Sequence, residues 1–162
     1  MKYRTTILLL VIGLFLGFAA PVQAAKPVIK SDNSYFDFTR GVYVLKGNVS
    51  VEVSNRLITA GEAKVSVVSL EVWGTGGITL TQDDIRFAGD SVYVNGSRHN
   101  AAMSGDVSFQ RGGLAITADE ADYNWQTKQG TFRNNVRIDD NGQIIAADRV
   151  AYDIATNSYQ AE

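Results

Sequence analysis

The side chains best suited to catalysis in this 162-residue chain are a single histidine and two pairs of adjacent acids. His99 lies in the polar segment 95–100, and no serine or carboxylate pattern around it marks a general base. The pairs Asp83-Asp84 and Asp139-Asp140 would need two carboxyl groups held across a cleft with separated pKa values. Both pairs fall in predicted hairpin turns, where solvated acids are common. We therefore expect His99 to be an exposed loop residue, and the sequence predicts no enzyme.

The sequence also contains few residues in patterns that would bind a metal or a cofactor. The segment Asp139 to Gly142 looks like part of a calcium loop, but it lacks the alternating oxygen ligands and the distant glutamate of such a site. The pair Asn141-Gly142 is typical of a type I′ hairpin turn, which explains the segment better. The chain contains no cysteine, which excludes disulfides and thiolate metal sites. The sequence predicts no metal and no cofactor.

A further group of acids recurs at similar points of successive segments. These acids are Glu62, Asp90, Asp119 and Asp148, and Gly61 and Gly89 precede the first two. Aspartate and glycine accept unusual backbone angles, so they suit a bend or bulge where a strand turns a corner of a sheet. We interpret these recurring residues as ones that bend the strands rather than as catalytic or binding groups.

The segments that carry these residues form a repeat. Its copies begin at Gly47, Gly76, Gly105 and Asn134, so successive starts lie 29 residues apart (76−47, 105−76, 134−105). Each copy has an alternating apolar stretch, a turn and a second stretch, and a half copy at 29–36 precedes them. A period of this size indicates one supersecondary unit stacked on its neighbours, and alternation with period two indicates antiparallel strands. We expect one all-β domain of about four 29-residue hairpin repeats.

The apolar side chains of these predicted strands project largely to one side. In an ordinary sandwich, two such sheets would close on each other and fill the gap at crystal-like density. Taken alone, the pattern favours a packed core over an open groove.

The first residues have the features of an export signal. Residues 1–4 are basic, residues 6–20 are almost entirely apolar, and Val22-Gln23-Ala24 offers the small residues that a signal peptidase reads. The apolar run is shorter than a membrane span of about 20 residues, which favours cleavage after Ala24 over an uncleaved inner-membrane anchor. We expect a signal peptide at 1–24 and a domain at 25–162. Loss of Lys2 and Arg4 would change the formal charge from −2 to −4, which argues against nucleic-acid binding.

The repeat resembles the OstA-like lipopolysaccharide-transport family, whose members include LptA-like and LptC-like proteins. In that family a strand opens with Gly-Asn-Val or Gly-Asp-Val, and the next closes with Ile-Thr-Ala-Asp-Glu-Ala-Asp-Tyr. The resemblance spans about Ile29 to Tyr152, and Val65 replaces the closing tyrosine in the first full copy. Its most specific parts are Gly105-Asp106-Val107 with Ile116 to Tyr123, and Asn135 to Ile138 with Ala147 to Tyr152.

This resemblance implies an open, twisted antiparallel β-jellyroll, which replaces the packed sandwich that the apolar pattern alone favours. Its two sheets would splay into an apolar groove that shelters the acyl chains of lipopolysaccharide, while the sugars stay outside, without enzyme activity or a cofactor. The groove-lining residues that it implies are Val49, Val51, Ile58, Val65, Ile78, Leu80, Phe87, Val107, Phe109, Leu114, Ile116, Tyr123, Trp125, Phe132, Val136, Ile138, Ile145 and Tyr152.

The resemblance also implies partners and a compartment. Lipopolysaccharide would be the ligand, and the protein would work in the periplasm of a Gram-negative cell in outer-membrane assembly. Other members of the family, in the inner and outer membranes, would join it by pairing of edge strands, as would further copies of this chain head to tail. The edges expected here are about 28–32 and 148–153. Cleavage of the signal would favour a soluble bridge between the two membranes.

Two other classes of protein fit parts of the sequence. A secreted carbohydrate-binding module would use Trp73, Tyr93 and Trp125 as stacking platforms, which predicts exposed aromatic side chains on a flat face. We expect Trp125 to lie in the interior or at a corner instead. A structural β-solenoid that only polymerises predicts rungs of uniform length without hairpins, and the regular turns between alternating strands argue against it.

Overall fold

All regular structure in the described part of the chain is β-strand. The computed structural model describes residues 28–53 and 55–162, so the expected signal peptide at 1–24 lies outside the described residues. Within them, no helix is long and apolar enough to cross a membrane. The all-β prediction is confirmed.

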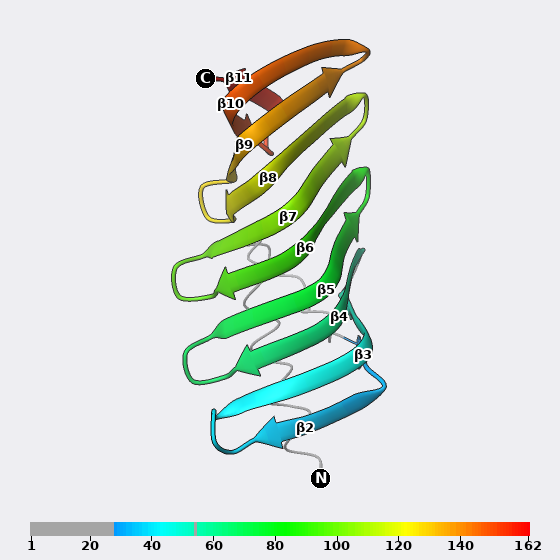
Figure 1. The fold of residues 1–162 in the computed structure, drawn as a ribbon, viewed down its shortest axis with the longest axis vertical. Helices are drawn as coiled ribbons and strands as arrows, with labels where there is room; N and C mark the ends of the chain where they lie inside the picture. The colour runs from blue at the N-terminus through cyan, green and yellow to red at the C-terminus, as the bar shows by residue number, and fades with distance from the viewer. Residues whose placement is uncertain (1–27, 54) are drawn as a thin grey trace.

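Eleven strands form one antiparallel sheet (Figure 1). They are β1 (Val28–Lys30), β2 (Asn33–Asp37), β3 (Val42–Val53), β4 (Arg56–Ser66), β5 (Glu71–Gln82), β6 (Ile85–Asn95), β7 (Asn100–Arg111), β8 (Leu114–Asn124), β9 (Gln129–Asp140), β10 (Gln143–Asp153) and β11 (Ser158–Ala161). From β3 to β11 each strand pairs with its neighbour in the chain, while β1 and β2 pair with opposite ends of β3. The sheet is therefore an open meander.

Each long strand is bent near its middle by a β-bulge. Pairs of residues with positive φ lie there, namely Gly47-Asn48 in β3, Gly76-Gly77 in β5, Gly105-Asp106 in β7 and Asn134-Asn135 in β9. The residues that each pair faces on the following strand are Gly61, Asp90, Asp119 and Asp148. We call this line of bulges the corner. It confirms that these glycine and aspartate positions set the shape of the sheet.

Two expectations about these segments are wrong. The repeat starts do not open strands, because their left-handed residues belong to bulges in the middle of β3, β5, β7 and β9. Glu62 does not occupy the corner but lies one residue beyond it, where its carboxylate pairs with Lys46 at 3.6 Å and Lys64 at 3.1 Å.

The turns opposite the hairpin tips share a local hydrogen-bond pattern. The side chains that accept bonds there from backbone N–H groups two or three residues later are Asp37, Ser66, Asn95, Asn124 and Asp153. The same turns place residues with positive φ at Gly41, Leu70, His99, Lys128 and Asn157. In each series successive residues lie 29 apart (66−37 and 70−41, for example). Each turn is thus closed by the same device, an Asx or Ser cap followed by a left-handed residue.

The corner divides the sheet into two halves. We call the part that ends at the hairpin tips, residues 49–60, 78–89, 107–118 and 136–147, the hairpin half. The turn half consists of residues 42–46, 62–75, 91–104, 120–133 and 149–153. The inner faces of the two halves approach each other, since Phe109 of the hairpin half lies 4.8 Å from Tyr152 of the turn half, between ring centroids.

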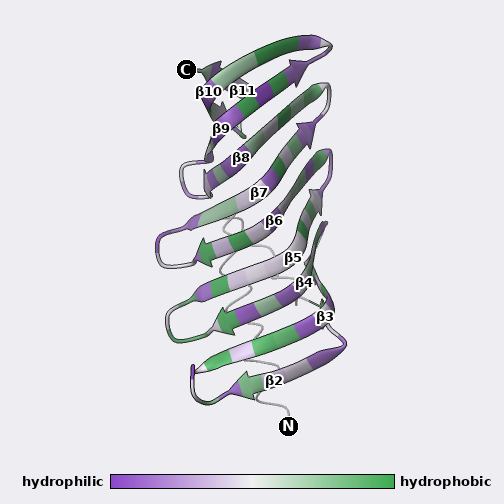
Figure 2. Ribbon diagram, in the orientation of Figure 1, coloured by the Kyte–Doolittle hydropathy of each residue, from purple (hydrophilic) through white to green (hydrophobic). Residues whose placement is uncertain are grey.

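The inner face of each half carries continuous rows of apolar side chains. Cross-strand partners in the hairpin half form the row Val51, Ile58, Leu80, Phe87, Phe109, Ile116, Ile138 and Ile145. Polar side chains alternate with them along the strands, as the bands of Figure 2 show. The buried cluster of the interior draws on both halves and is richest in residues from β7 to β10.

The C-terminal edge differs from the expected one. Residues 150–153 of β10 pair with β11, so they are not a free edge. Residues 143–147 of β10 have β9 on one side and no strand on the other among the described residues. At the N-terminal end, β1 lies at the edge of the sheet, in agreement with the expected edge at 28–32.

Candidate functional site

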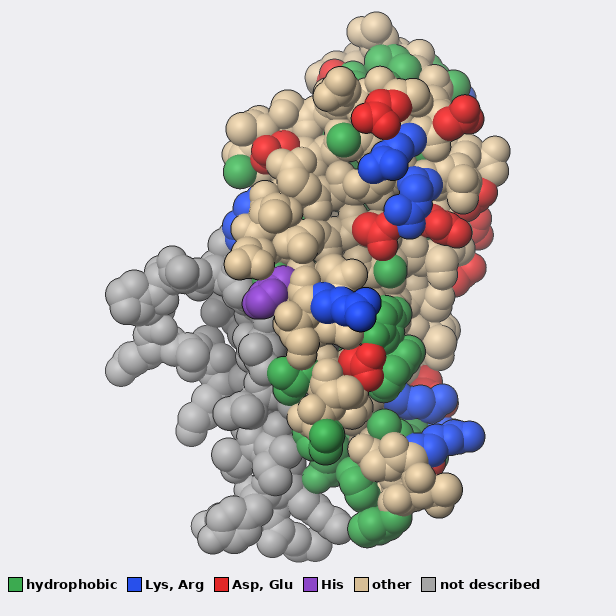
Figure 3. Space-filling model, turned by 90° about the vertical axis from the view of Figure 1, so that its left-hand side faces the viewer, with side chains coloured by type: hydrophobic (Ala, Val, Ile, Leu, Met, Phe, Trp, Pro, Cys, Tyr) green, Lys and Arg blue, Asp and Glu red, His purple; other side chains and the backbone are tan. Residues whose placement is uncertain are grey.

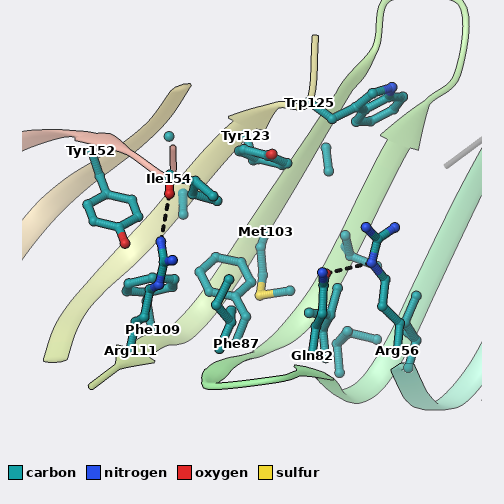
Figure 4. A pocket seen from close by; sticks show the side chains of 18 of the residues that line it. Arg56, Gln82, Phe87, Met103, Phe109, Arg111, Tyr123, Trp125, Tyr152 and Ile154 are labelled. Atoms are coloured by element: carbon teal, nitrogen blue, oxygen red, sulfur yellow. Dashed lines mark hydrogen bonds between the residues drawn. The ribbon is translucent and has the colours of Figure 1, made fainter. Parts of the chain in front are cut away.

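A cavity of about 420 Å³ lies between the inner faces of the two halves (Figure 4). Its size is within the range of small-molecule sites. Its walls come from strands β3 to β10, and most of the side chains that line it are apolar. Because the corner folds the sheet onto itself, one continuous sheet supplies both walls.

The structure divides the expected groove-lining residues into two sets. Those that line the cavity are Val51, Ile58, Ile78, Leu80, Phe87, Phe109, Tyr123, Trp125, Phe132 and Tyr152. Those on the interior side but away from the cavity are Val49, Val65, Val107, Leu114, Ile116, Val136, Ile138 and Ile145. In the second set, Ile116 and Ile138 are 0% exposed. The interior thus combines a packed core with a lined cavity.

Small residues make room for the cavity. Ala121 lies on one inner row of the turn half, Ala101 and Gly130 lie on the next, and all three line the cavity. Larger side chains on the same two rows also line the cavity and were missed from the sequence: Val92, Val94 and Met103. The alternation of Val92 and Val94 in β6 was the signal that could have identified them.

Aromatic rings span the interior from one half to the other. Phe109 lies 4.8 Å from Tyr152 and 5.9 Å from Phe132, and Phe87 lies 6.1 Å from Phe132. Edge-to-face and tilted arrangements at these separations are favourable beyond the area that they bury. These rings hold the two halves together where the chain approaches its C-terminus.

The mouth of the cavity is polar. The Arg56 guanidinium donates to Gln82 Oε1 at 2.5 Å, and Asp83 accepts from Asn55 Nδ2 at 2.7 Å. Burial lowers the pKa of Arg56 and raises the pKa of Tyr123. Figure 4 shows Arg56 and Gln82 on the tip side of the cavity. From the sequence, the pair Asp83-Asp84 was interpreted as solvated turn residues, and the place of Arg56 and Gln82 at the mouth was missed.

One bond crosses the mouth. Arg111 Nη1 donates to the carbonyl oxygen of Ile154 at 2.6 Å, which joins the end of β7 to the turn after β10 (Figure 4). The same guanidinium pairs with Asp84, with Nε 3.4 Å from Oδ2. A second bond runs from Tyr159 OH of β11 to Asp140 Oδ2 at 3.2 Å. The two halves are therefore tied together at the C-terminal end of the cavity.

The remaining candidates for chemistry form no catalytic arrangement. His99 lies in a turn as predicted, but it is half-buried rather than exposed because its ring packs against Trp125, 5.9 Å between centroids. In Figure 3 this histidine reaches the surface on the side of the turns. Both Asn141 and Gly142 have positive φ, which confirms the type I′ turn. Within residues 28–53 and 55–162, no group of three His, Cys, Asp or Glu side chains could hold a metal ion.

Comparison with known proteins adds sequence and structural relatives. A family model described as LptA/(LptD N-terminal domain) LPS transport protein matches residues 28–158. Over 62 residues, the chain is 32% identical to the LPS-assembly protein LptD of Pseudomonas putida strain W619 and 31% identical to that of strain GB-1. The alignment covers 38% of this chain and 7% of each relative, so the chain spans a small part of their length.

A solved structure has the same fold. It is LptH, described as the LptA homologous periplasmic component of the conserved lipopolysaccharide transport device from Pseudomonas aeruginosa. The TM-score is 0.53 at 13% identity, and the match covers 62% of this chain and 76% of that one. The predicted open antiparallel β-jellyroll is confirmed, and the hairpins contradict a β-solenoid. With a family match over most of its length, the chain belongs to the family of LptA and LptD N-terminal domain lipopolysaccharide transport proteins.

Proposed function

We propose that this chain is a periplasmic transport protein that binds lipopolysaccharide and shelters its lipid A acyl chains in the cavity between the two halves. The observation that carries this proposal is an apolar cavity, framed by a polar mouth, in a member of a lipopolysaccharide transport family. Signal cleavage after Ala24 would deliver the domain to the periplasm.

The physical task is to keep acyl chains out of water. Each methylene group withheld from water is worth about 0.8 kcal/mol, so an acyl chain of about a dozen carbons would cost roughly 10 kcal/mol to expose. A lined groove removes this cost without any covalent step. For the lipid to move on, its binding at each station must stay weak, and a cavity that is open to solvent favours such exchange.

The ends of the sheet supply the proposed partner surfaces. Residues 143–147 of β10 and the strand β1 present backbone groups along the edges of the described sheet. Strand addition at such edges would extend the interior from one chain to the next. We propose that family members at the inner and outer membranes, or further copies of this chain, add there and continue the groove into a bridge.

Photo-crosslinking from neighbouring residues on opposite faces tests the groove. Leu80 lines the cavity, whereas the next residue, Thr81, is exposed on the outer face. We expect a photoreactive amino acid at position 80 to form adducts with lipopolysaccharide and the same group at position 81 to form none. Equal adducts from both positions, or none from position 80 in a folded protein, would reject the groove.

A further inference from the structure

The outer face of the turn half carries a second cavity. It has a volume of about 340 Å³ and lies on the side of β5 to β9 that faces away from the groove. The side chains that project to this face around it are Trp73, Thr75, Ser91, Tyr93, Ala102, Ser104, Glu120, Asp122 and Arg133. This set is unlike the apolar lining of the groove, because it combines an aromatic wall, a charged wall and a floor of small residues.

Two aromatic rings form one wall. Trp73 and Tyr93 are cross-strand partners whose ring centroids lie 5.8 Å apart with an interplanar angle of 36°. The Tyr93 hydroxyl donates to Glu71 Oε1 and accepts from Asn95 Nδ2, which fixes the ring. Trp73 remains 36% exposed, so a face of its indole is open to solvent. An ordered, exposed ring offers a flat apolar surface at little cost in conformational entropy.

Charged side chains form the opposite wall. The Arg133 guanidinium pairs with Asp122 and also with Glu120, at 3.5 Å. These two carboxylates accept hydrogen bonds and the guanidinium donates them, so the wall offers both kinds of partner side by side. Among the residues that line this cavity, Arg133 is the one cation beside the two acids, while Lys64 and Arg149 are cross-strand neighbours of Trp73 and Arg133.

The floor between the walls is shallow and polar. Ala102 lies between Tyr93 and Asp122 in one cross-strand row, and Ser104 lies in the next row. Ser104 shares a hydrogen bond with Ser91, with 2.9 Å between the two hydroxyl oxygens. Small side chains here leave room between the aromatic and the charged wall for a ring-shaped ligand.

We propose that this outer cavity binds a pyranose unit of a neutral or amino-substituted saccharide. The apolar face of the sugar ring would stack on Trp73, and its hydroxyl groups would donate to Asp122 and Glu120 and accept from Arg133. The carboxylates of Asp122 and Glu120 would attract an amino group on such a sugar. Val92, Met103, Ala121 and Asp122 line both cavities, whereas Trp73, Glu120 and Arg133 line the outer one and not the groove. Because the proposed stacking ring belongs to the outer cavity, the proposal does not rest on the function proposed for the groove.

The two tryptophans of the chain report the two sites separately. Trp73 belongs to the outer cavity and Trp125 to the lining of the groove. We would titrate the ¹⁵N-labelled protein with cellotriose and with chitotriose, and use sorbitol as the control polyol. The proposal predicts that either trisaccharide shifts the Trp73 indole signal and the Ala102 amide signal, while the Trp125 indole signal stays in place.

Variants assign the binding to the two walls. With the Ala102 amide as the reporter, Trp73→Ala should weaken binding about tenfold, the change expected from the loss of one aromatic contact. Asp122→Asn should weaken it as well, whereas Trp125→Phe should not. Shifts confined to Trp125, equal shifts with sorbitol, absence of shifts at saturating sugar, or unchanged binding in Trp73→Ala would each overturn the proposal. Crosslinking of lipopolysaccharide at position 80 should be the same in Trp73→Ala, which separates this test from that of the groove.

Discussion

At the scale of single residues, the interior contains two kinds of apolar side chain. Ile138 is 0% exposed and packs in the core, whereas Leu80 is half-buried and lines the cavity. We expect Ile138→Ala to lower the free energy of unfolding by about 2–5 kcal/mol, because it leaves a hole in a packed region. Leu80→Ala should cost less stability and should weaken capture of lipopolysaccharide. Urea unfolding and a lipopolysaccharide-binding assay on both variants would check this, and equal stability losses would contradict it.

The bond across the mouth makes a second prediction at this scale. Arg111→Met removes the donor to the Ile154 carbonyl and the pairing with Asp84. We expect a loss of about 1–3 kcal/mol, the usual value for a hydrogen bond to a charged group, and faster amide exchange in the turn after β10. Arg86→Met is the matched control, because Arg86 is exposed on the outer face of β6. Equal exchange rates in the two variants would show that Arg111 does not tie the turn after β10 to the end of β7.

The sequence predicted which side chains face the interior, but it did not predict whether each one lines the cavity or packs in the core. Period-two alternation places Phe87 and Ile116 on one side of the sheet whatever the other half does. Whether such a residue meets a cavity or a packed neighbour depends on the half across the corner. On the turn half, the groove is lined in part by Ala121 and Gly130, small residues that carry little apolar signal of their own. Local patterns therefore cannot separate the groove from the core.

At the scale of the elements, the corner depends on residues that tolerate left-handed backbone. Gly105 has φ +78°, and a Cβ placed there would lie 2.3 Å from Asp90 Oδ2. We expect Gly105→Ala to destabilise the protein by about 1–3 kcal/mol. Gly112 at a hairpin tip has φ +57° with open space around it, so Gly112→Ala should cost less. Asp90→Ala should recover part of the Gly105→Ala loss in a double-mutant cycle, and full additivity would show that the two positions are not coupled.

The capped turns predict a dependence of stability on pH. The backbone N–H of Thr156 and other donors around it lower the pKa of Asp153. A carboxyl group with a lowered pKa in the folded state stabilises the protein above its unfolded pKa of about 3.9, and this contribution is lost as the pH falls toward the folded pKa. Asp153→Asn should flatten the stability profile in this acidic range. Urea midpoints measured against pH for both proteins would check the prediction, and parallel profiles would refute it.

The corner also explains the misplaced strand starts. A Gly-Asn or Gly-Asp pair followed by an alternating apolar run is the usual sign of a turn before a strand. The same backbone angles serve a bulge inside a strand, and only the pairing with both neighbours separates the two. The turn that Ser66 caps was harder to recognise, because its left-handed residue, Leu70, is of a type that rarely adopts positive φ.

At the scale of the whole molecule, the open edges of the sheet are the features that set its assembly. Ile144 lies in the part of β10 that pairs with β9 on one side and has no described strand on the other, and it is 46% exposed. We expect Ile144→Lys to reduce self-association, because a charge on an edge strand disfavours strand addition. Sedimentation velocity over a range of concentrations would measure this. Thr81→Lys, on an interior strand, is the control and should leave association unchanged.

The fold class of this molecule was predictable from the sequence, whereas its cavities were not. The repeat and its resemblance to a transport family predicted an open all-β sheet, and the fold class and the family were confirmed. The expected free edge at 148–153 was wrong, since β11 pairs there, and the short segment 158–161 gave little strand signal of its own. Prediction of the outer cavity would have required the register of five strands. Only that register shows that Trp73 and Asp122 lie in the same cross-strand row.

The strands follow one another across the sheet in chain order, so the number of hairpins sets the length of the sheet. Every strand from β4 to β10 pairs its backbone only with its immediate neighbours in the sequence, so no backbone pairing with a distant strand fixes the total number of strands. Neighbouring strands lie about 4.8 Å apart, and one hairpin therefore adds about 10 Å to the height of the stack. Removal of residues 77–105 would join equivalent corner positions and keep both halves in register. Insertion or loss of such a unit would change the distance that the domain spans without a new fold.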